Sequence, residues 1–196
     1  MNILIAGDSF GAEWPSKNNN VGWPNLLSSN FKITNVSQAG VGEYKILKQI
    51  ESVDQNNYDI MIINHTSPSR VHTKQHPIHS TGLHKNCDLL YNDIDRKFSF
   101  FNRSLRTACN WFLYHYDDKY QIDIYNLVRK EIENRIHIPH IAISHMPIAA
   151  KYRIEKNYLD FSDLWQRHRG DVNHYDKEGN QLVSLTIENK ICKILD

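Results

Sequence analysis

The stretch Asn2-Ile3-Leu4-Ile5-Ala6-Gly7-Asp8-Ser9 decides the fold class of this chain. Its apolar run is short and ends at a glycine, which is typical of a buried parallel strand whose carboxyl end leads into a loop. The run at 59–63 has the same character, and shorter strands are predicted at 32–36 and 137–144. Helical spacing of apolar residues between these strands predicts helices over 22–29 and 43–53.

The second half of the chain continues this alternation of strands and helices. Helical periodicity runs from Phe98 to Phe112 and again over 124–135, with a break near Asp117 and Asp118, and a terminal amphipathic helix is expected at 180–195. A fifth strand is not visible in the sequence. The alternation predicts an α/β protein, a three-layer α/β/α sandwich with a mostly parallel sheet of about five strands.

Length and charge restrict the organisation and the partners of the chain. The 196 residues are enough for one sizeable core, so we expect a single domain over 1–196 with a long polar insertion at about 65–97. The net charge is +1 and no apolar stretch approaches a membrane-spanning length, which argues against nucleic-acid and membrane partners. The start of the chain lacks a basic leader, so a cytoplasmic location is expected. Three widely spaced cysteines predict free thiols, and no pattern predicts the oligomeric state.

Polar residues follow the predicted strands at the edge where an open parallel sheet forms its sites, beyond the carboxyl ends of the strands. Gly7-Asp8-Ser9 follows the first strand, the segment 35–40 ending at Gly40 follows the second, and Asn64-His65-Thr66-Ser67 follows the third. Asp171 and His174 stand ahead of the terminal helix. Together these segments supply a serine, a glycine, amide or hydroxyl donors, and an aspartate three residues before a histidine.

These segments, in this order, resemble the SGNH hydrolases of the GDSL esterase superfamily. The family's markers are a serine in Gly-Asp-Ser, a glycine, an asparagine, and a histidine in Asp-x-x-His, and Ser9, Gly40 and His174 fit their positions. The third block departs, because the family's Gly-x-Asn-Asp is replaced by Asn64-His65-Thr66-Ser67. The resemblance implies a flavodoxin-like SGNH fold, a serine esterase acting on small O-acyl esters such as an O-acetyl group on a carbohydrate, and no cofactor.

Elementary chemistry agrees with that resemblance. A serine hydroxyl needs an adjacent base, which His174 can provide for Ser9 because imidazole titrates near neutral pH. Asp171 would hold the ring in the right tautomer. The plainer alternatives are that Ser9 only caps a turn and that Asp171 and His174 only cap the last helix.

The oxyanion of such a reaction needs fixed donors. Backbone N–H groups of Ser9 and Gly40 are candidates, although Gly40 can also be an ordinary turn glycine. The third donor would be a side chain after the third strand. We favour Asn64, because the plane of its amide fixes the N–H, over Thr66, whose hydroxyl rotates freely.

Five histidines lie in the polar insertion. His72 and His76 have the i,i+4 spacing that binds metals on a helix, but only Cys87 and Asp88 lie nearby as further ligands. We therefore predict a polar surface loop or a substrate-binding lid, with no metal ligand. His65, beside the oxyanion candidates, and Arg70, which with three tryptophans can wall a cleft suited to sugars, are the predicted substrate-binding residues. The remaining histidines of the insertion are His79 and His84.

Three other functions remain open from the sequence. An O-acyltransferase would place a sugar hydroxyl where the hydrolase uses water, and a catalytically silent binding module would keep the scaffold without turnover. A nucleotide-binding flavodoxin-like protein is disfavoured, because the segment 7–11 matches neither the P-loop nor the dinucleotide fingerprint.

Overall fold

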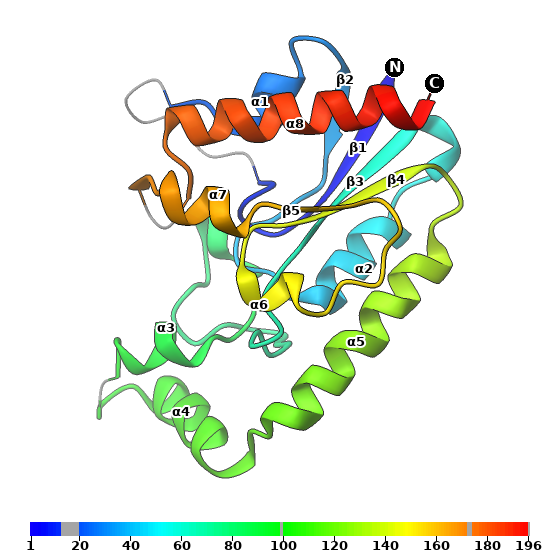
Figure 1. Ribbon diagram of the computed structural model, residues 1–196. Helices are drawn as coiled ribbons and strands as arrows, with labels where there is room; N and C mark the ends of the chain where they lie inside the picture. Colours follow the sequence, from blue (N-terminus) through cyan, green and yellow to red (C-terminus); the bar gives the residue numbers. More distant parts are fainter. Residues whose placement is uncertain (13–19, 99, 172–173, 196) are drawn as a thin grey trace.

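Five parallel strands form one sheet, in the order β2-β1-β3-β4-β5 (Figure 1). This computed structural model describes residues 1–12, 20–98, 100–171 and 174–195. The order is that of the flavodoxin-like doubly wound fold, so the predicted α/β class and parallel sheet are confirmed. The strands are β1 (Asn2–Gly7), β2 (Lys32–Asn35), β3 (Ile60–His65), β4 (His140–Ser144) and β5 (Tyr158–Asp160).

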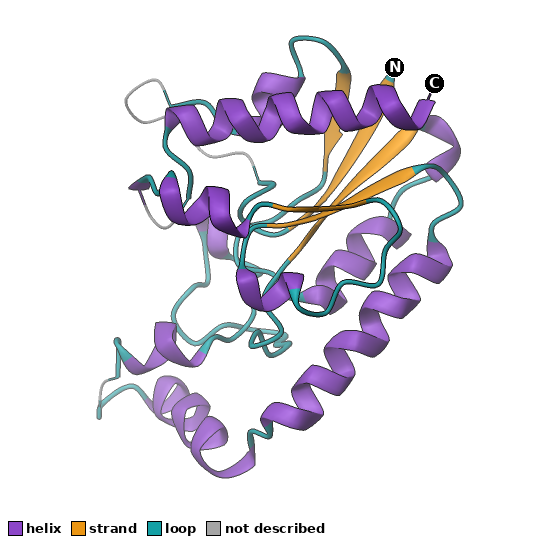
Figure 2. Ribbon diagram, viewed as in Figure 1, coloured by secondary structure: helices purple, strands orange, loops and turns teal. Residues whose placement is uncertain are grey.

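Helices cover both faces of the sheet, which makes the predicted three layers (Figure 2). Helices α1 and α8 pack on one face and helices α2 and α5 on the other. The described helices are α1 (Trp23–Leu27), α2 (Glu43–Glu51), α3 (Tyr91–Asp95), α4 (Arg103–His115), α5 (Asp118–Arg135), α6 (Pro147–Ala150), α7 (Ser162–Arg167) and α8 (Lys177–Leu195). None of the helices in the described ranges is long and apolar enough to cross a bilayer.

The first strand shows why the sheet needs two helical layers. Successive side chains of a strand point to opposite faces, and Ile3 and Ile5 enter the core under α1 and α8, whereas Leu4 and Ala6 enter the core under α2 and α5. All four side chains are fully buried. A strand that is apolar on both faces can be stable only between two layers, as the uninterrupted apolar run predicted.

Several element boundaries differ from the sequence prediction. Strand β3 continues through His65, two residues past its expected end, and β4 begins at His140, after Pro139 rather than before it. Helix α4 begins at Arg103 rather than near Phe98. The break before α5 is confirmed, because the Asp117 side chain accepts a hydrogen bond from the Tyr120 N–H (2.9 Å) and caps that helix.

The polar insertion is a folded segment beyond the carboxyl edge of the sheet. An antiparallel bridge between Val71 and Leu89 closes its base, and a short 3₁₀ turn, η2 (Gly82–His84), lies inside the loop. Helices α3 and α4 project away from the sheet (Figure 1) and share a small core of their own, which includes Leu105 and Phe112. The three cysteines are free thiols, as predicted.

Candidate active site

The loop after β1 is held in a tight turn by Asp8. Its carboxylate is buried and accepts hydrogen bonds from the Phe10 N–H (2.9 Å) and from the side-chain amide of Asn64 (2.6 Å). Its main-chain carbonyl accepts the N–H groups of Gly11 and Ala12. Burial raises the pKa of the Asp8 carboxyl, and the positive charge of Arg70 opposes that rise. Ser9 therefore lies in a turn whose geometry is fixed on both sides.

Gly7 allows this turn to lie directly on β3. A Cβ atom added to Gly7 would stand 2.5 Å from the Cβ of Asn64 and 2.7 Å from its carbonyl oxygen, so only glycine fits there. Because Gly7 lies so close to Asn64, the loop that carries Ser9 packs against the end of β3, where the segment 64–67 begins.

His174 reaches the same loop from the C-terminal part of the chain. Its ring lies beside the ring of Phe10, the residue after Ser9, with 5.0 Å between the ring centroids. The fold therefore brings His174 to the carboxyl end of β1, into the neighbourhood of Ser9.

Asp171 is exposed, and the described contact between it and His174 runs through the backbone. The His174 N–H donates to the Asp171 carbonyl (3.1 Å). The orientation of the imidazole by the Asp171 carboxylate stays a prediction. The alternative in which these residues cap α8 loses its basis, because the Asp176 carboxylate accepts the Gly179 N–H (2.7 Å) in the capping position.

His145 is a site residue that the sequence analysis missed. It follows β4 directly, its ring stacks on Phe10 at 4.6 Å, and its Nδ1 lies 2.7 Å from the Tyr175 hydroxyl. Burial, together with the charge of nearby His174, lowers the pKa of His145 to about 3, so this ring is neutral at physiological pH. The predicted strand stopped one residue before it. The rule that sites lie beyond strand ends would have found it.

Gly40 has a backbone that no other residue can adopt easily. Its φ of +75° is left-handed, and a Cβ there would stand 2.6 Å from the Cβ of Cys87. Its carbonyl accepts hydrogen bonds from Arg70 Nη1 (3.1 Å) and from the Asp88 N–H (2.9 Å). The base of the insertion is thereby attached to Gly40, whose role as an oxyanion donor stays a prediction.

The two candidates for the third oxyanion donor both lie beside Asp8. Asn64 is fully buried in β3 and uses one N–H of its amide for the Asp8 carboxylate, which leaves the second N–H of that group. The Thr66 hydroxyl is also buried close to the Asp8 carboxylate, and the Thr66 carbonyl accepts the Tyr125 hydroxyl (3.0 Å). The geometry leaves both candidates open.

The prediction that His65 binds substrate is corrected by the structure. Its side chain is fully buried, with Nδ1 2.8 Å from Glu43 and Nε2 3.1 Å from Glu155. These carboxylates raise the pKa of His65 although burial alone would lower it. The prediction failed because β3 is longer than expected, so His65 lies in the sheet and not in the loop.

The His65 contacts belong to a buried charge network under α5. Arg129 binds both carboxylate oxygens of Glu155 (2.6 Å each) and also donates to the Tyr125 hydroxyl and the Ala149 carbonyl. Burial would raise the pKa of Glu155, but His65 and Arg129 hold the pKa of that carboxyl well below its usual range. The network ties α5 to the carboxyl end of β3.

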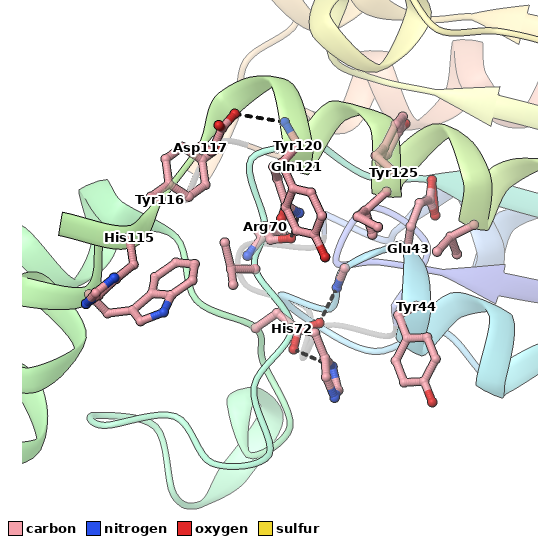
Figure 3. Close-up of a pocket in the computed structure, with 16 residues that line it drawn as sticks. Glu43, Tyr44, Arg70, His72, His115, Tyr116, Asp117, Tyr120, Gln121 and Tyr125 are labelled. Carbon is pink, nitrogen blue, oxygen red and sulfur yellow. Dashed lines mark hydrogen bonds and ion pairs between the residues drawn. The ribbon is translucent and has the colours of Figure 1, made fainter. Parts of the chain in front are cut away.

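Two cavities flank the insertion. A partly open cavity of about 220 Å³ lies between the first turn of α2, the C-terminal end of α4 and the first half of α5, with Glu43, Arg70 and Tyr125 in its wall (Figure 3). A more open groove of about 610 Å³ runs between the segment 67–70, helices α3 and α4, and the residues after β4, Met146 and Ile148. This groove opens at the carboxyl ends of β3 and β4.

Arg70 lines both cavities and contacts the Gly40 carbonyl, so it lies at the edge of the candidate site. Of the tryptophans predicted beside it, the two within the described residues do not line these two cavities. Trp23 is buried in the core at 1% exposure, Trp165 is half-buried under the guanidinium of Arg169, and Trp14 lies outside the described residues.

The chain is similar in structure to known proteins. No family model and no curated protein matches the chain. Among solved structures, the chain is similar to a candidate lipolytic protein of the G-D-S-L family from Desulfitobacterium hafniense DCB-2, with 16% sequence identity and a TM-score of 0.46. The similarity covers 96% of this chain and 98% of that one, and the motifs of this sequence resemble the same family.

Proposed function

We propose that this chain is a serine hydrolase of the SGNH type that cleaves small O-acyl esters. One observation carries the proposal: the Gly7-Asp8-Ser9 turn and His174 come from opposite ends of the sequence and meet around Phe10, beyond the carboxyl end of the interior strand β1. Sites of open parallel sheets form at this edge. The motif resemblance assigns the same two residues to nucleophile and base.

The proposed reaction has two steps. Ser9 Oγ attacks the ester carbonyl while His174 takes its proton, and the tetrahedral intermediate collapses to an acyl-serine as His174 returns that proton to the leaving alcohol. Water then attacks the acyl-serine, again with His174 as base, and releases the acid and free Ser9. Asp171 is the proposed positioning residue for the imidazole.

The proposed substrate is a small acyl ester, such as an O-acetyl group on a carbohydrate. The groove beside the site suits an alcohol of mixed polarity, because its wall combines Ser67, Arg70 and Asn92 with Met146 and Ile148. Arg70 is the proposed contact for substrate hydroxyl groups.

Labelling with a fluorophosphonate tests the proposal directly. The full chain should gain one phosphonyl group per molecule, measured by intact mass, and Ser9→Ala should gain none. Ser162→Ala is the matched control, since Ser162 is also buried and follows a strand at the same edge of the sheet. Absence of labelling in the unmodified chain, or equal labelling of Ser9→Ala, would contradict the proposal.

A pair of substitutions tests the third oxyanion donor. Asn64→Ala should lower kcat about a hundredfold to a thousandfold with little change in KM, because one donor to the oxyanion is lost. Thr66→Val keeps the side-chain volume and should change kcat by less than about tenfold. Steady-state kinetics on a short-chain aryl ester measures both.

The reverse pattern would move the donor to Thr66. Because Asn64 also holds Asp8, Asp8→Ala separates the two effects. If Asp8→Ala loses as much kcat as Asn64→Ala, Asn64 acts through the turn and not on the oxyanion.

A further inference from the structure

Three potential metal ligands converge inside the polar insertion. The ligand atoms of His76, His79 and Cys87 all lie within 4.8 Å of one another. His76 and Cys87 are buried and His79 is half-buried. Ligand atoms around a tetrahedral zinc ion lie roughly 3.3–3.7 Å apart at its usual bond lengths, so a small closure of the loop would complete the site.

The spacing along the chain supports the same grouping. His76 and His79 form one pair separated by two residues, and His84 and Cys87 form a second pair with the same separation. Two close pairs of ligands are the usual arrangement of structural zinc sites, and here only four residues separate the pairs. Gly82, with a φ of +69° and open space around its Cβ position, makes the turn between the pairs. The His84 ring lies 5.2 Å from the His79 ring, so a fourth potential ligand stands beside the three that converge.

The His76 ring already presents a lone pair inside this turn. Its Nδ1 accepts two long hydrogen bonds, from the N–H groups of Ile78 (3.2 Å) and His79 (3.3 Å). A cation can bind this ring at Nε2, or at Nδ1 in place of these two bonds.

The i,i+4 pair of His72 and His76, considered from the sequence, is not the relevant one. Residues 71–81 are not helical, and the His72 ring instead lies against Tyr44, with Nδ1 3.4 Å from Asp88. The cluster combines His76 with residues further along the chain, a grouping that helical spacing does not indicate.

We propose that His76, His79, His84 and Cys87 bind one zinc-type divalent transition-metal ion. A set of three imidazoles and one thiolate suits zinc better than magnesium or calcium, which prefer oxygen ligands. On binding, the Cys87 thiol loses its proton to solvent and the sulfur binds as thiolate.

The role of the ion would be structural. Cys87 packs against Gly40, and the N–H of its neighbour Asp88 donates to the Gly40 carbonyl. Four ligands within twelve residues would fix the insertion, and through Cys87 they would fix the loop that carries the predicted oxyanion glycine. The ion would then support the site without touching the substrate.

Cobalt(II) tests this site in the full chain. Protein stripped with a chelator should bind one cobalt per chain, with a thiolate-to-cobalt charge-transfer band in the near ultraviolet and intense visible bands of a four-coordinate ion. Zinc should displace the cobalt. Cys87→Ser should lose the charge-transfer band, and His76→Gln, His79→Gln or His84→Gln should weaken binding by at least about tenfold.

Two matched variants serve as controls. Cys192→Ser removes an exposed thiol outside the insertion, and His72→Gln removes the nearest histidine outside the cluster; both should bind cobalt as the unmodified chain does. Circular dichroism of the metal-free variants shows that they fold. No bound cobalt, or a charge-transfer band that survives Cys87→Ser, would overturn the proposal. The measurement can be made on Ser9→Ala, so it does not depend on hydrolase activity.

Discussion

Ser9→Ala, His174→Ala and the double variant are expected to hydrolyse a short-chain aryl ester at one shared residual rate, about 10⁴-fold or more below the unmodified chain. The nucleophile and its base serve a single step, so removal of either disables the same chemistry and removal of both adds nothing. Values of kcat for the three variants, measured at equal folded concentration, provide the test.

Two control substitutions distinguish loss of the Ser9 and His174 pair from general damage to the fold. Ser162→Ala and His137→Gln remove a serine and a histidine outside the proposed pair, and both should keep kcat within about threefold of the unmodified chain. His137 is exposed and precedes β4, at the opposite edge of the sheet from the site. If the losses of Ser9→Ala and His174→Ala multiply in the double variant, the two residues do not act as a unit.

Arg129→Met should lower the free energy of unfolding by about 3–5 kcal/mol. Among the described contacts, Arg129 alone binds both oxygens of the Glu155 carboxylate. Its removal leaves that carboxylate buried without its strongest partner. Urea unfolding followed by circular dichroism measures the change.

An exposed arginine on the same helix provides the matched control. Arg135 binds Glu131 at 2.6 Å, as closely as Arg129 binds Glu155, but in solvent, so Arg135→Met should change stability by no more than about 1 kcal/mol. The double variant Arg129→Met, Glu155→Leu should recover much of the loss, because no buried charge remains unpaired. Equal effects of Arg129→Met and Arg135→Met would show that burial does not govern this network.

The fold was predictable where burial leaves a strong pattern. Strands β1 and β3 are apolar on both faces because helices cover both, and this produces the uninterrupted runs of the sequence. Strand β5 has three residues at the edge of the sheet, Tyr158–Asp160, of which the first two are half-buried and the last exposed. Such a segment is too short for any periodicity to indicate it.

The site was less predictable, because it depends on exact strand ends and on contacts across turns. A shift of two residues in the end of β3 turned His65 from an expected substrate contact into a buried member of an ion network. The grouping of His76 with Cys87 depends on a glycine turn between two close pairs, which a search for helical spacing does not detect. The positions of Ser9 and His174 in the sequence predicted that both lie at the carboxyl ends of the strands. The direction of the Asn64 amide, in contrast, could come only from three-dimensional packing.

Helix α8 has a consequence for how this chain folds during its synthesis. It follows every strand along the chain, and its Val183, Ile187 and Ile191 are fully buried over one face of the sheet. A nascent chain that ends before residue 174 has neither His174 nor α8, so it holds Ser9 without its proposed base and leaves exposed the apolar surface that α8 covers. Translation stalled before residue 174 would therefore yield an intermediate that is both inactive and prone to aggregation, and synthesis of residues 174–195 would remove first one defect and then the other.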